Sequence, residues 1–222
     1  MKILIVAATE EEIDPFSALL RRDWSFDETG IFRKGNITID VLITGIGMMR
    51  TAYALGKVLN VSKPDLCINA GIAGAFPGKF EIGNVVHVVK ESIPELGAID
   101  SNGKHLTLSE MGLKEDISST EGFVNSEAGA FDFLPRANGI TVNTVHGDVK
   151  GITQIQKDYD PDIESMESAA FFYCCIKESV PFIAIRAVSN IVEPRDRSKW
   201  DIPLAIKNLN GQLMELIDYL SS

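Results

Sequence analysis

The sequence has few cysteines, no run of basic residues and no long apolar segment, and each absence excludes a class of protein. Only three of the 222 residues are cysteines, and two of these, Cys174 and Cys175, are adjacent and cannot link distant segments. This usage is typical of a reducing compartment, so we expect a cytoplasmic protein. The formal net charge is −10, and without a basic patch we expect no nucleic acid and no anionic membrane surface as partner. No apolar run approaches the roughly 18 residues of a membrane helix, and glutamates stand where a signal peptide would be cleaved.

Metal and nucleotide motifs are missing as well. The three histidines, His87, His105 and His146, are scattered, with no HxxxH or Cys/His cluster, so we expect no metal site. The turn at residues 45–50, Gly-Ile-Gly-Met-Met-Arg, lacks the third glycine of GxGxxG, and no GxxxxGK[ST] is found. Its glycines either permit a tight strand-to-helix turn or let bare backbone approach a ligand. We therefore expect no cofactor, and both interpretations of the glycines stay open.

The sequence does contain an alternation of short β-branched runs with helical segments, which is typical of an α/β sheet covered by helices. Residues 91–125 are polar and poorly periodic, so we expect long loops there. We expect one domain over residues 1–222, with a mixed central sheet in three αβα layers. The strands are expected at residues 3–8, 37–44, 66–70, 84–89, 140–145 and 182–188, and the helices after Thr9 and at residues 49–60, 167–178 and 203–220.

Acidic residues, an arginine and an amide come close to the ends of predicted strands, at the edge where open α/β sheets bind ligands. Three glutamates at residues 10–12 follow the first strand, where acids can also simply complement the dipole of a helix. Glu167, Arg186 and Asn190 lie near later strand ends. Two carboxylates, an arginine and an amide at one edge suit glycosyl transfer or hydrolysis. That chemistry needs a base for water and negative charge beside an oxocarbenium-like sugar.

Five segments, taken in order, resemble the nucleoside phosphorylase superfamily. They are Ala-Thr-Glu-Glu-Glu at residues 8–12, Thr-Gly-Ile-Gly at 44–47, Asn-Ala-Gly-Ile-Ala-Gly at 69–74, Ser-Met-Glu at 165–167 and Arg-Ala-Val-Ser-Asn at 186–190. The similarity is greatest to the methylthioadenosine/adenosylhomocysteine nucleosidases. It extends over nearly the whole chain and implies the nucleoside phosphorylase fold, together with a homodimer in which the neighbour closes the pocket for the 5′ substituent.

The resemblance also implies a role for each residue. Glu12 is expected to be the general base that activates water, and Arg186 to help hold both the water and Glu12. Glu167 is expected to bind the ribose 2′- and 3′-hydroxyls, with Met166 packed on the sugar. Further residues expected to line the sugar and the purine are Ile46, Ile72, Ala73, Lys150, Gly151 and Ser189.

Asn190 stands where the methylthioadenosine enzymes carry an aspartate. That aspartate protonates N7 of adenine and accepts a hydrogen bond from the 6-amino group. An asparagine instead donates an N–H to a 6-oxo group and offers its carbonyl to an N7–H. Opposite adenine, one polar group would lack a partner, at a cost of roughly 1–3 kcal/mol. Asn190 therefore favours hypoxanthine or guanine as the leaving base.

The segment that follows, residues 190–197 with Trp200, resembles the futalosine hydrolases. These enzymes release hypoxanthine from a nucleoside with a carboxyphenyl-ketone tail, in menaquinone biosynthesis. Arg195 and Arg197 are expected either to meet the carboxylate of such a tail or to form Arg–Asp pairs in a solvated loop.

Phosphorylases of the superfamily place Gly-Asp-Pro and an arginine after the first strand to bind phosphate. Here residues 7–9 are Ala-Ala-Thr and glutamates follow, so the local charge would repel phosphate and favour water. The sequence predicts hydrolysis of the N-ribosidic bond of a 6-oxopurine nucleoside. The alternatives are a methylthioadenosine/adenosylhomocysteine nucleosidase, a 6-oxopurine nucleoside phosphorylase and a non-catalytic nucleoside-binding or storage protein.

Overall fold

A large mixed sheet runs through the protein in a computed structural model that describes residues 1–113, 122–125 and 133–221. Its strands are β1 (Lys2–Ala7), β2 (Ser25–Phe26), β3 (Phe32–Lys34), β4 (Ile37–Ile43), β5 (Leu66–Ala75), β6 (Val85–Ser92), β9 (Phe123–Val124), β10 (Arg136–Thr141), β11 (Ile163–Ser165) and β12 (Phe182–Ile191). Their order is β11-β10-β6-β12-β5-β1-β4-β3-β2, with β9 beside β6. Because β11 also pairs with β5, the strands β5, β12, β6, β10 and β11 close into a ring. The expected mixed α/β sheet is confirmed.

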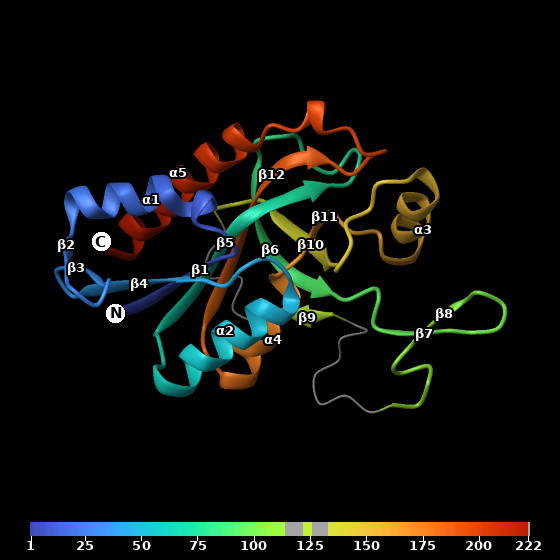
Figure 1. The fold of residues 1–222 in the computed structure, drawn as a ribbon, viewed down its shortest axis with the longest axis horizontal. Helices are drawn as coiled ribbons and strands as arrows, with labels where there is room; N and C mark the ends of the chain where they lie inside the picture. The colour runs from blue at the N-terminus through green and yellow to red at the C-terminus, as the bar shows by residue number, and fades with distance from the viewer. Residues whose placement is uncertain (114–121, 126–132, 222) are drawn as a thin grey trace.

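Helices cover both faces of this sheet. Figure 1 shows α1 (Glu10–Asp23) and α5 (Ile202–Ser221) on one face and α2 (Met48–Val61) and α4 (Ser168–Glu178) on the other. A further helix, α3 (Val149–Tyr159), lies at the end of the molecule remote from both termini. The expected three-layer arrangement is therefore confirmed. None of the helices within the described ranges combines the length and apolar character that crossing a bilayer requires.

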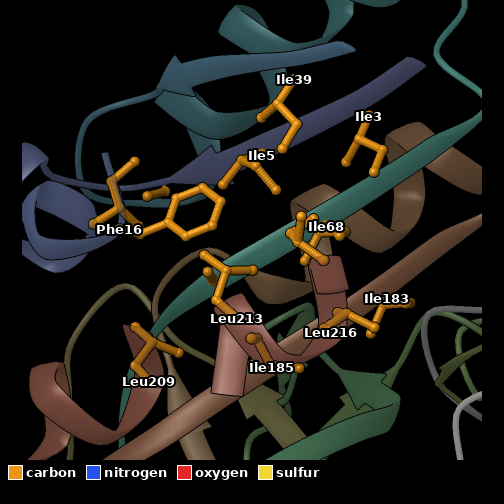
Figure 2. Packing of buried hydrophobic residues seen from close by; sticks show 14 of the residues in the cluster. Ile3, Ile5, Phe16, Ile39, Ile68, Ile183, Ile185, Leu209, Leu213 and Leu216 are labelled. Carbon is orange, nitrogen blue, oxygen red and sulfur yellow. The ribbon is translucent and has the colours of Figure 1, made fainter. Parts of the chain in front are cut away.

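Aliphatic side chains fill the layer between the sheet and the helices α1 and α5. Ile3 and Ile5 of β1 point to the same face of the sheet, where they meet Phe16 of α1 and Leu213 of α5 (Figure 2). These four side chains are at most 2% exposed, and burying each one stabilises the fold by roughly 1.5–3 kcal/mol. The core therefore fixes β1 and its neighbours, whose carboxyl ends carry the residues singled out in the sequence.

Two sequence expectations about secondary structure are wrong. Residues 91–125, expected as long loops, hold β9 and a separate ribbon of β7 (Gly97–Ile99) and β8 (His105–Thr107), while residues 114–121 lie outside the described residues. The ribbon buries few side chains, so its sequence lacks the alternation of apolar and polar residues from which a strand is predicted. The strand expected at residues 140–145 is β10, which begins and ends four residues earlier, at Arg136 and Thr141.

The segment between the fifth expected strand and α4 was not predicted to form secondary structure. Its residues form helix α3 and strand β11. Two residues of α3 are buried, Ile152 and Ile155, and β11 has three residues, which is too short for a periodic pattern. Both central strands β5 and β12 also run further than expected, so the Gly-Ile-Ala-Gly segment at residues 71–74 is strand and not turn.

Candidate active site

The motifs of the sequence meet at one edge of the sheet. The strands β1, β4, β5 and β12 run parallel, which brings their carboxyl ends to the same edge. Glu12 follows β1, the glycine turn follows β4, and Arg186 and Asn190 belong to β12. Glu167 joins them from the link between β11 and α4. The topology thus assembles residues that lie up to 178 positions apart in the chain.

Backbone N–H groups hold the Glu12 carboxylate on two sides. Oε2 accepts hydrogen bonds from the N–H groups of Ala8 (3.1 Å) and Thr9 (3.0 Å), and Oε1 accepts one from Ile72 (3.1 Å). A Cβ on Gly71 would lie 3.0 Å from Oε1, so the absence of a side chain at Gly71 allows β5 to approach the Glu12 carboxylate closely. Burial raises the pKa of Glu12, while the bonds from Ile72 and Thr9 and the charge of Arg186 oppose the increase. The result is a fixed carboxylate with increased basicity, as a general base requires.

The glycine turn after β4 positions Glu167. Gly45 and Gly47 have φ values of 83° and 100°, which residues with a side chain rarely adopt, so the tight-turn interpretation is correct. Gly47 also donates its backbone N–H to Oε1 of Glu167, over 2.9 Å. The turn therefore holds one carboxylate oxygen of Glu167 and, at the same time, starts helix α2.

Arg186 lies beneath these carboxylates and is 1% exposed. Its terminal nitrogens donate to the side-chain and backbone oxygens of Asn69 and to Oγ of Ser168, which is 2.7 Å away. Its Nε has no hydrogen-bond partner among the described residues. Burial lowers the pKa of Arg186, and the nearby charges of Glu167 and Glu12 oppose that change. The guanidinium is thus a buried positive charge close enough to interact with Glu12, the predicted general base, and with Glu167, the predicted ribose ligand.

Another buried carboxylate near Arg186, Glu91 on β6, was missed by the sequence analysis. It is fully buried and accepts a hydrogen bond from Oγ1 of Thr141 over 2.9 Å. Burial raises the pKa of Glu91 to about 7, although Thr141 and Arg186 oppose the increase. A Cβ on Gly139 would come within 2.3 Å of its Oε1, so that glycine makes room for the carboxylate. Glu91 lies inside a predicted loop region, and no sequence signal placed it beside the site.

A β-bulge brings Asn190 to the edge of a small cavity. The pairing of β12 with β5 shifts between Val188 and Asn190, so that Asn190 and not Ser189 lies opposite Gly74. A Cβ on Gly74 would lie 3.1 Å from Nδ2 of Asn190. Nδ2 donates to the carbonyl of Ile191 (3.2 Å), and this bond determines which way the amide faces. One amide hydrogen and one lone pair of Oδ1 then remain for another partner.

The cavity at Asn190 is also lined by residues that the sequence analysis did not select. It has a volume of about 50 Å³, and its lining includes Gly74, His146, Glu164, Asn190, Arg195 and Trp200. Nδ1 of His146 lies 2.7 Å from Oε2 of Glu164, which is 4% exposed. The sequence offered no signal for this pair, because Glu164 belongs to the short strand β11 that was not predicted.

The two arginines after β12 are not equivalent. Arg195 lines the cavity, whereas Arg197 is not among its lining residues and belongs to a short 3-10 helix, η2 (Arg197–Lys199). Both guanidinium groups lie over the ring of Trp200, with their carbons 5.1 Å and 5.8 Å from its centre. The expected Arg–Asp pairing is not among the ion pairs described for this loop, where Lys199 instead binds Glu193 at 2.7 Å.

The remaining predicted residues are near the site, with different degrees of exposure. Ile46 is 51% exposed in the glycine turn, Met166 is half-buried next to Glu167, and Ala73 is buried in β5. Ser189 is buried and bonds Oδ1 of Asn190 over 2.9 Å. Lys150 and Gly151 lie in the first turn of α3, where the N–H of Gly151 is already bonded to Asp148. The structure thus gives Ser189 a contact with Asn190, whereas within the described part of the chain no hydrogen bond or ion pair joins Lys150 to the other predicted site residues.

Known proteins similar to this chain include nucleosidases and futalosine hydrolases. No family model matches the chain. The 5′-methylthioadenosine/S-adenosylhomocysteine nucleosidase of Maridesulfovibrio salexigens is 30% identical over 217 residues, covering 86% of this chain and 87% of its own. The futalosine hydrolase of Acidothermus cellulolyticus is 29% identical over 215 residues, covering 94% and 87%.

Solved structures show the same fold. The native futalosine hydrolase of Helicobacter pylori superposes with a TM-score of 0.82 at 17% identity, covering 99% of this chain and 98% of its own. The chain therefore belongs to the family of 5′-methylthioadenosine/S-adenosylhomocysteine nucleosidases and futalosine hydrolases, which are N-glycosyl hydrolases.

Proposed function

We propose that this protein hydrolyses the N-ribosidic bond of a 6-oxopurine nucleoside, with futalosine as the preferred substrate and hypoxanthine as the released base. The observation that carries the proposal is Asn190 on the bulge of β12, beside the cavity opened by Gly74. Its free amide hydrogen can bond the 6-oxo group, and its free carbonyl lone pair can accept from an N7–H. Adenine would present a second NH₂ group to that amide and leave one polar group without a partner.

The sugar side of the site supplies the hydrolytic step. Glu12, with its raised pKa, takes a proton from water as the oxygen attacks C1′ and the C1′–N9 bond breaks. Glu167 has one oxygen bonded to Gly47, and its carboxylate can accept from the ribose hydroxyls and stabilise the cationic sugar of the transition state. Arg186 keeps charge balance between the two carboxylates, and its unpaired Nε offers a donor to the water.

Charge at the site favours water over phosphate as the attacking group. Glu12, Glu91 and Glu167 are all close enough to Arg186 to affect its pKa. Three carboxylates around one buried arginine leave a net negative site when all are ionised, which repels a phosphate dianion. We therefore propose hydrolysis and not phosphorolysis.

A panel of nucleosides tests the proposal. Futalosine, inosine, 5′-methylthioadenosine and S-adenosylhomocysteine are incubated with the protein, with and without phosphate, and the released base is quantified. We expect release from futalosine to be fastest and unchanged by phosphate. A requirement for phosphate would identify a phosphorylase, and no release from any nucleoside would contradict an enzymatic role.

The second candidate function is that of a 5′-methylthioadenosine/S-adenosylhomocysteine nucleosidase. It is favoured by the relative from Maridesulfovibrio salexigens, which carries that name at 30% identity. The two functions share the sugar side of the site and differ at the base, so Asn190 distinguishes between them. Faster release of adenine than of hypoxanthine in the panel would establish the second function.

We further propose a homodimer of one nucleosidase domain, residues 1–222, acting in the cytoplasm in menaquinone biosynthesis. Three large apolar side chains in the glycine turn and on α2 support the dimer: Ile46, Met49 and Tyr53 are 51%, 82% and 70% exposed. Ile46 lies in the turn that holds Glu167 and the other two follow on α2, so a second copy covering them would lie next to the sugar side. Sedimentation velocity tests the dimer.

The proposed cytoplasmic location is supported by the cysteines, because three free, buried cysteines suit a reducing compartment.

A further inference from the structure

The proposed substrate raises the question of where the leaving base obtains a proton. When the C1′–N9 bond breaks, its electron pair moves onto the purine, and a proton at N7 stabilises the departing base. An asparagine has no proton that it can give up at neutral pH. The N7–H that Asn190 is proposed to accept therefore comes from a group other than Asn190, and a titratable group at the same cavity is a candidate.

His146 and Glu164 are a titratable pair on that cavity. Glu164 on β11 and Asn190 on β12 are both register partners of Gly74, on opposite sides of β5. The two residues are thus separated by about 10 Å, which is two strand spacings, across the position where Gly74 has no side chain. His146, whose ring bonds Glu164, lines the cavity with Asn190.

Glu164 fixes the imidazole of His146. Its Oε2 lies 2.7 Å from Nδ1, and its Oε1 accepts the backbone N–H of the same histidine at 3.1 Å. With Nδ1–H bonded to a carboxylate that is 4% exposed, Nε2 is the ring nitrogen left for exchange with a ligand. This is the geometry by which a buried carboxylate orients a catalytic imidazole.

We propose that His146, oriented by Glu164, is the general acid that protonates the leaving purine; the inference rests on the proposed function. As the C1′–N9 bond breaks, Nε2 gives its proton to N7, directly or through one water. Water adds OH to C1′ and passes its other proton to Glu12. Solvent then removes a proton from Glu12 and returns one to His146, so the net reaction is nucleoside plus water giving ribose product plus free base.

The surroundings of His146 contain other charges that affect its proton. Besides Glu164, the cavity is lined by Glu193 and Arg195 from the loop after β12. Asp148, the N-cap of α3, is also near His146, because both side chains lie close to Gly151. A Cβ on Gly151 would be 2.9 Å from Asp148 Oδ2 and 3.4 Å from His146 Cδ2. The test below therefore compares substrates at one pH and does not depend on assigning a titration.

Substrates whose leaving group needs no proton separate acid catalysis from a structural role. We compare wild type, His146→Gln and Glu164→Gln on inosine, on 7-methylinosine, whose base leaves neutral, and on 4-nitrophenyl β-D-ribofuranoside, which leaves as a phenolate. We expect His146→Gln to lower kcat/KM for inosine roughly 100-fold and to change the other two less than about threefold. Glu164→Gln should lower the inosine value about tenfold and likewise spare the other two.

Controls make the result decisive. His105→Gln, on β8 in the separate ribbon, should retain wild-type rates on every substrate. Equal losses on inosine and on both activated substrates, or no loss on inosine, would overturn the assignment of His146. If His146→Gln has a lowered Tm, the assignment is judged on Glu164→Gln instead: a loss on inosine that spares the two activated substrates supports it, and equal losses on all three contradict it. A wild-type protein that hydrolyses no purine nucleoside would instead refute the proposed function, so the two failures are distinguishable.

Discussion

The proposed sugar side of the site, with Glu12, Glu167, Arg186 and Glu91, and the proposed base side, with Asn190, His146, Glu164 and Arg195, are built in different ways. On the sugar side, Glu12 and Arg186 are 8% and 1% exposed and are held by bonds that exist without any ligand. On the base side, Asn190 is half-buried on a bulge and Arg195 is exposed in a loop. Side chains on a bulge and a loop can change with little effect on the sheet. Under the proposed function, the core of the fold thus positions the residues that carry out the hydrolysis, whereas more easily replaced residues select the base.

The largest effect is expected on the sugar side, at Glu12. Glu12→Gln keeps the shape of the side chain but removes its ability to accept a proton, so kcat should fall roughly 100-fold or more while KM changes little. Glu10→Gln, an exposed neighbour in the same helical turn, is the matched control and should retain full activity. Near wild-type turnover by Glu12→Gln would show that another group activates the water.

A smaller loss of rate is expected for Glu167. Glu167→Gln removes the charge that favours a cationic sugar, so kcat should fall about tenfold to 100-fold with less change in ground-state affinity. In the wild type, a 2′-deoxynucleoside should react more slowly than the ribonucleoside. Equal rates on the two sugars would mean that Glu167 does not bind the 2′-hydroxyl.

Glu91 tests whether the sugar side is a buried network of charges, with stability as the measurement. Its pKa of about 7 in the folded protein lies above the ordinary value of 4.5. Between these values the folded form binds the proton more tightly, so stability falls as pH rises from about 4.5 to 7 and then levels off. The fall is at most about 3 kcal/mol for this group.

Glu91→Gln should therefore flatten the pH dependence of the free energy of unfolding between pH 5 and pH 8. Urea titrations at the two pH values measure the difference, and a slope remains from Glu12 and Glu164, whose pKa values burial also raises. The same slope in the wild type and in Glu91→Gln would mean that Glu91 is not a buried ionisable group of this network.

The smallest effect is expected at the arginines of the base side. Arg195 lines the cavity and Arg197 does not, so Arg195→Ala should raise KM for futalosine several-fold. Arg197→Ala should raise it less than about threefold, because it removes only one exposed contact with the ring of Trp200. If Arg195 binds the carboxylate of the futalosine tail, its loss should affect futalosine more than inosine. Equal changes on both substrates would assign Arg195 to the base or to packing.

The positions of two residues proposed for the sugar side could be predicted from the sequence because these residues lie in or next to clearly apolar strands. Glu12 follows β1 and Arg186 lies within β12, and both strands have continuous buried runs that mark them clearly. The glycine turn after β4 was also visible as a motif. The roles proposed for them come from the family resemblance, and the structure adds the contacts that hold their side chains.

The base side was harder to predict because it depends on features without periodicity. The bulge that places Asn190 opposite Gly74 changes the register of β12 by one residue, and no residue pattern predicts it. Glu164 lies on a three-residue strand. Glu91, which belongs to the sugar side, was equally hard to predict because it lies at the end of β6, in a region expected to be loops. Tertiary pairing, and not local propensity, determines these positions.

The most direct test of the central claim is the base preference of the wild type and of Asn190→Asp. The ratio of kcat/KM for futalosine to that for 5′-methylthioadenosine is measured in both proteins, with Asn208→Asp on α5 as the matched amide control. The wild type should prefer futalosine, and Asn190→Asp should lower the ratio about tenfold to 100-fold, because an acceptor replaces the donor opposite the 6-oxo group, at roughly 1–3 kcal/mol. A wild type that prefers 5′-methylthioadenosine, or a ratio unchanged by Asn190→Asp, would contradict the account.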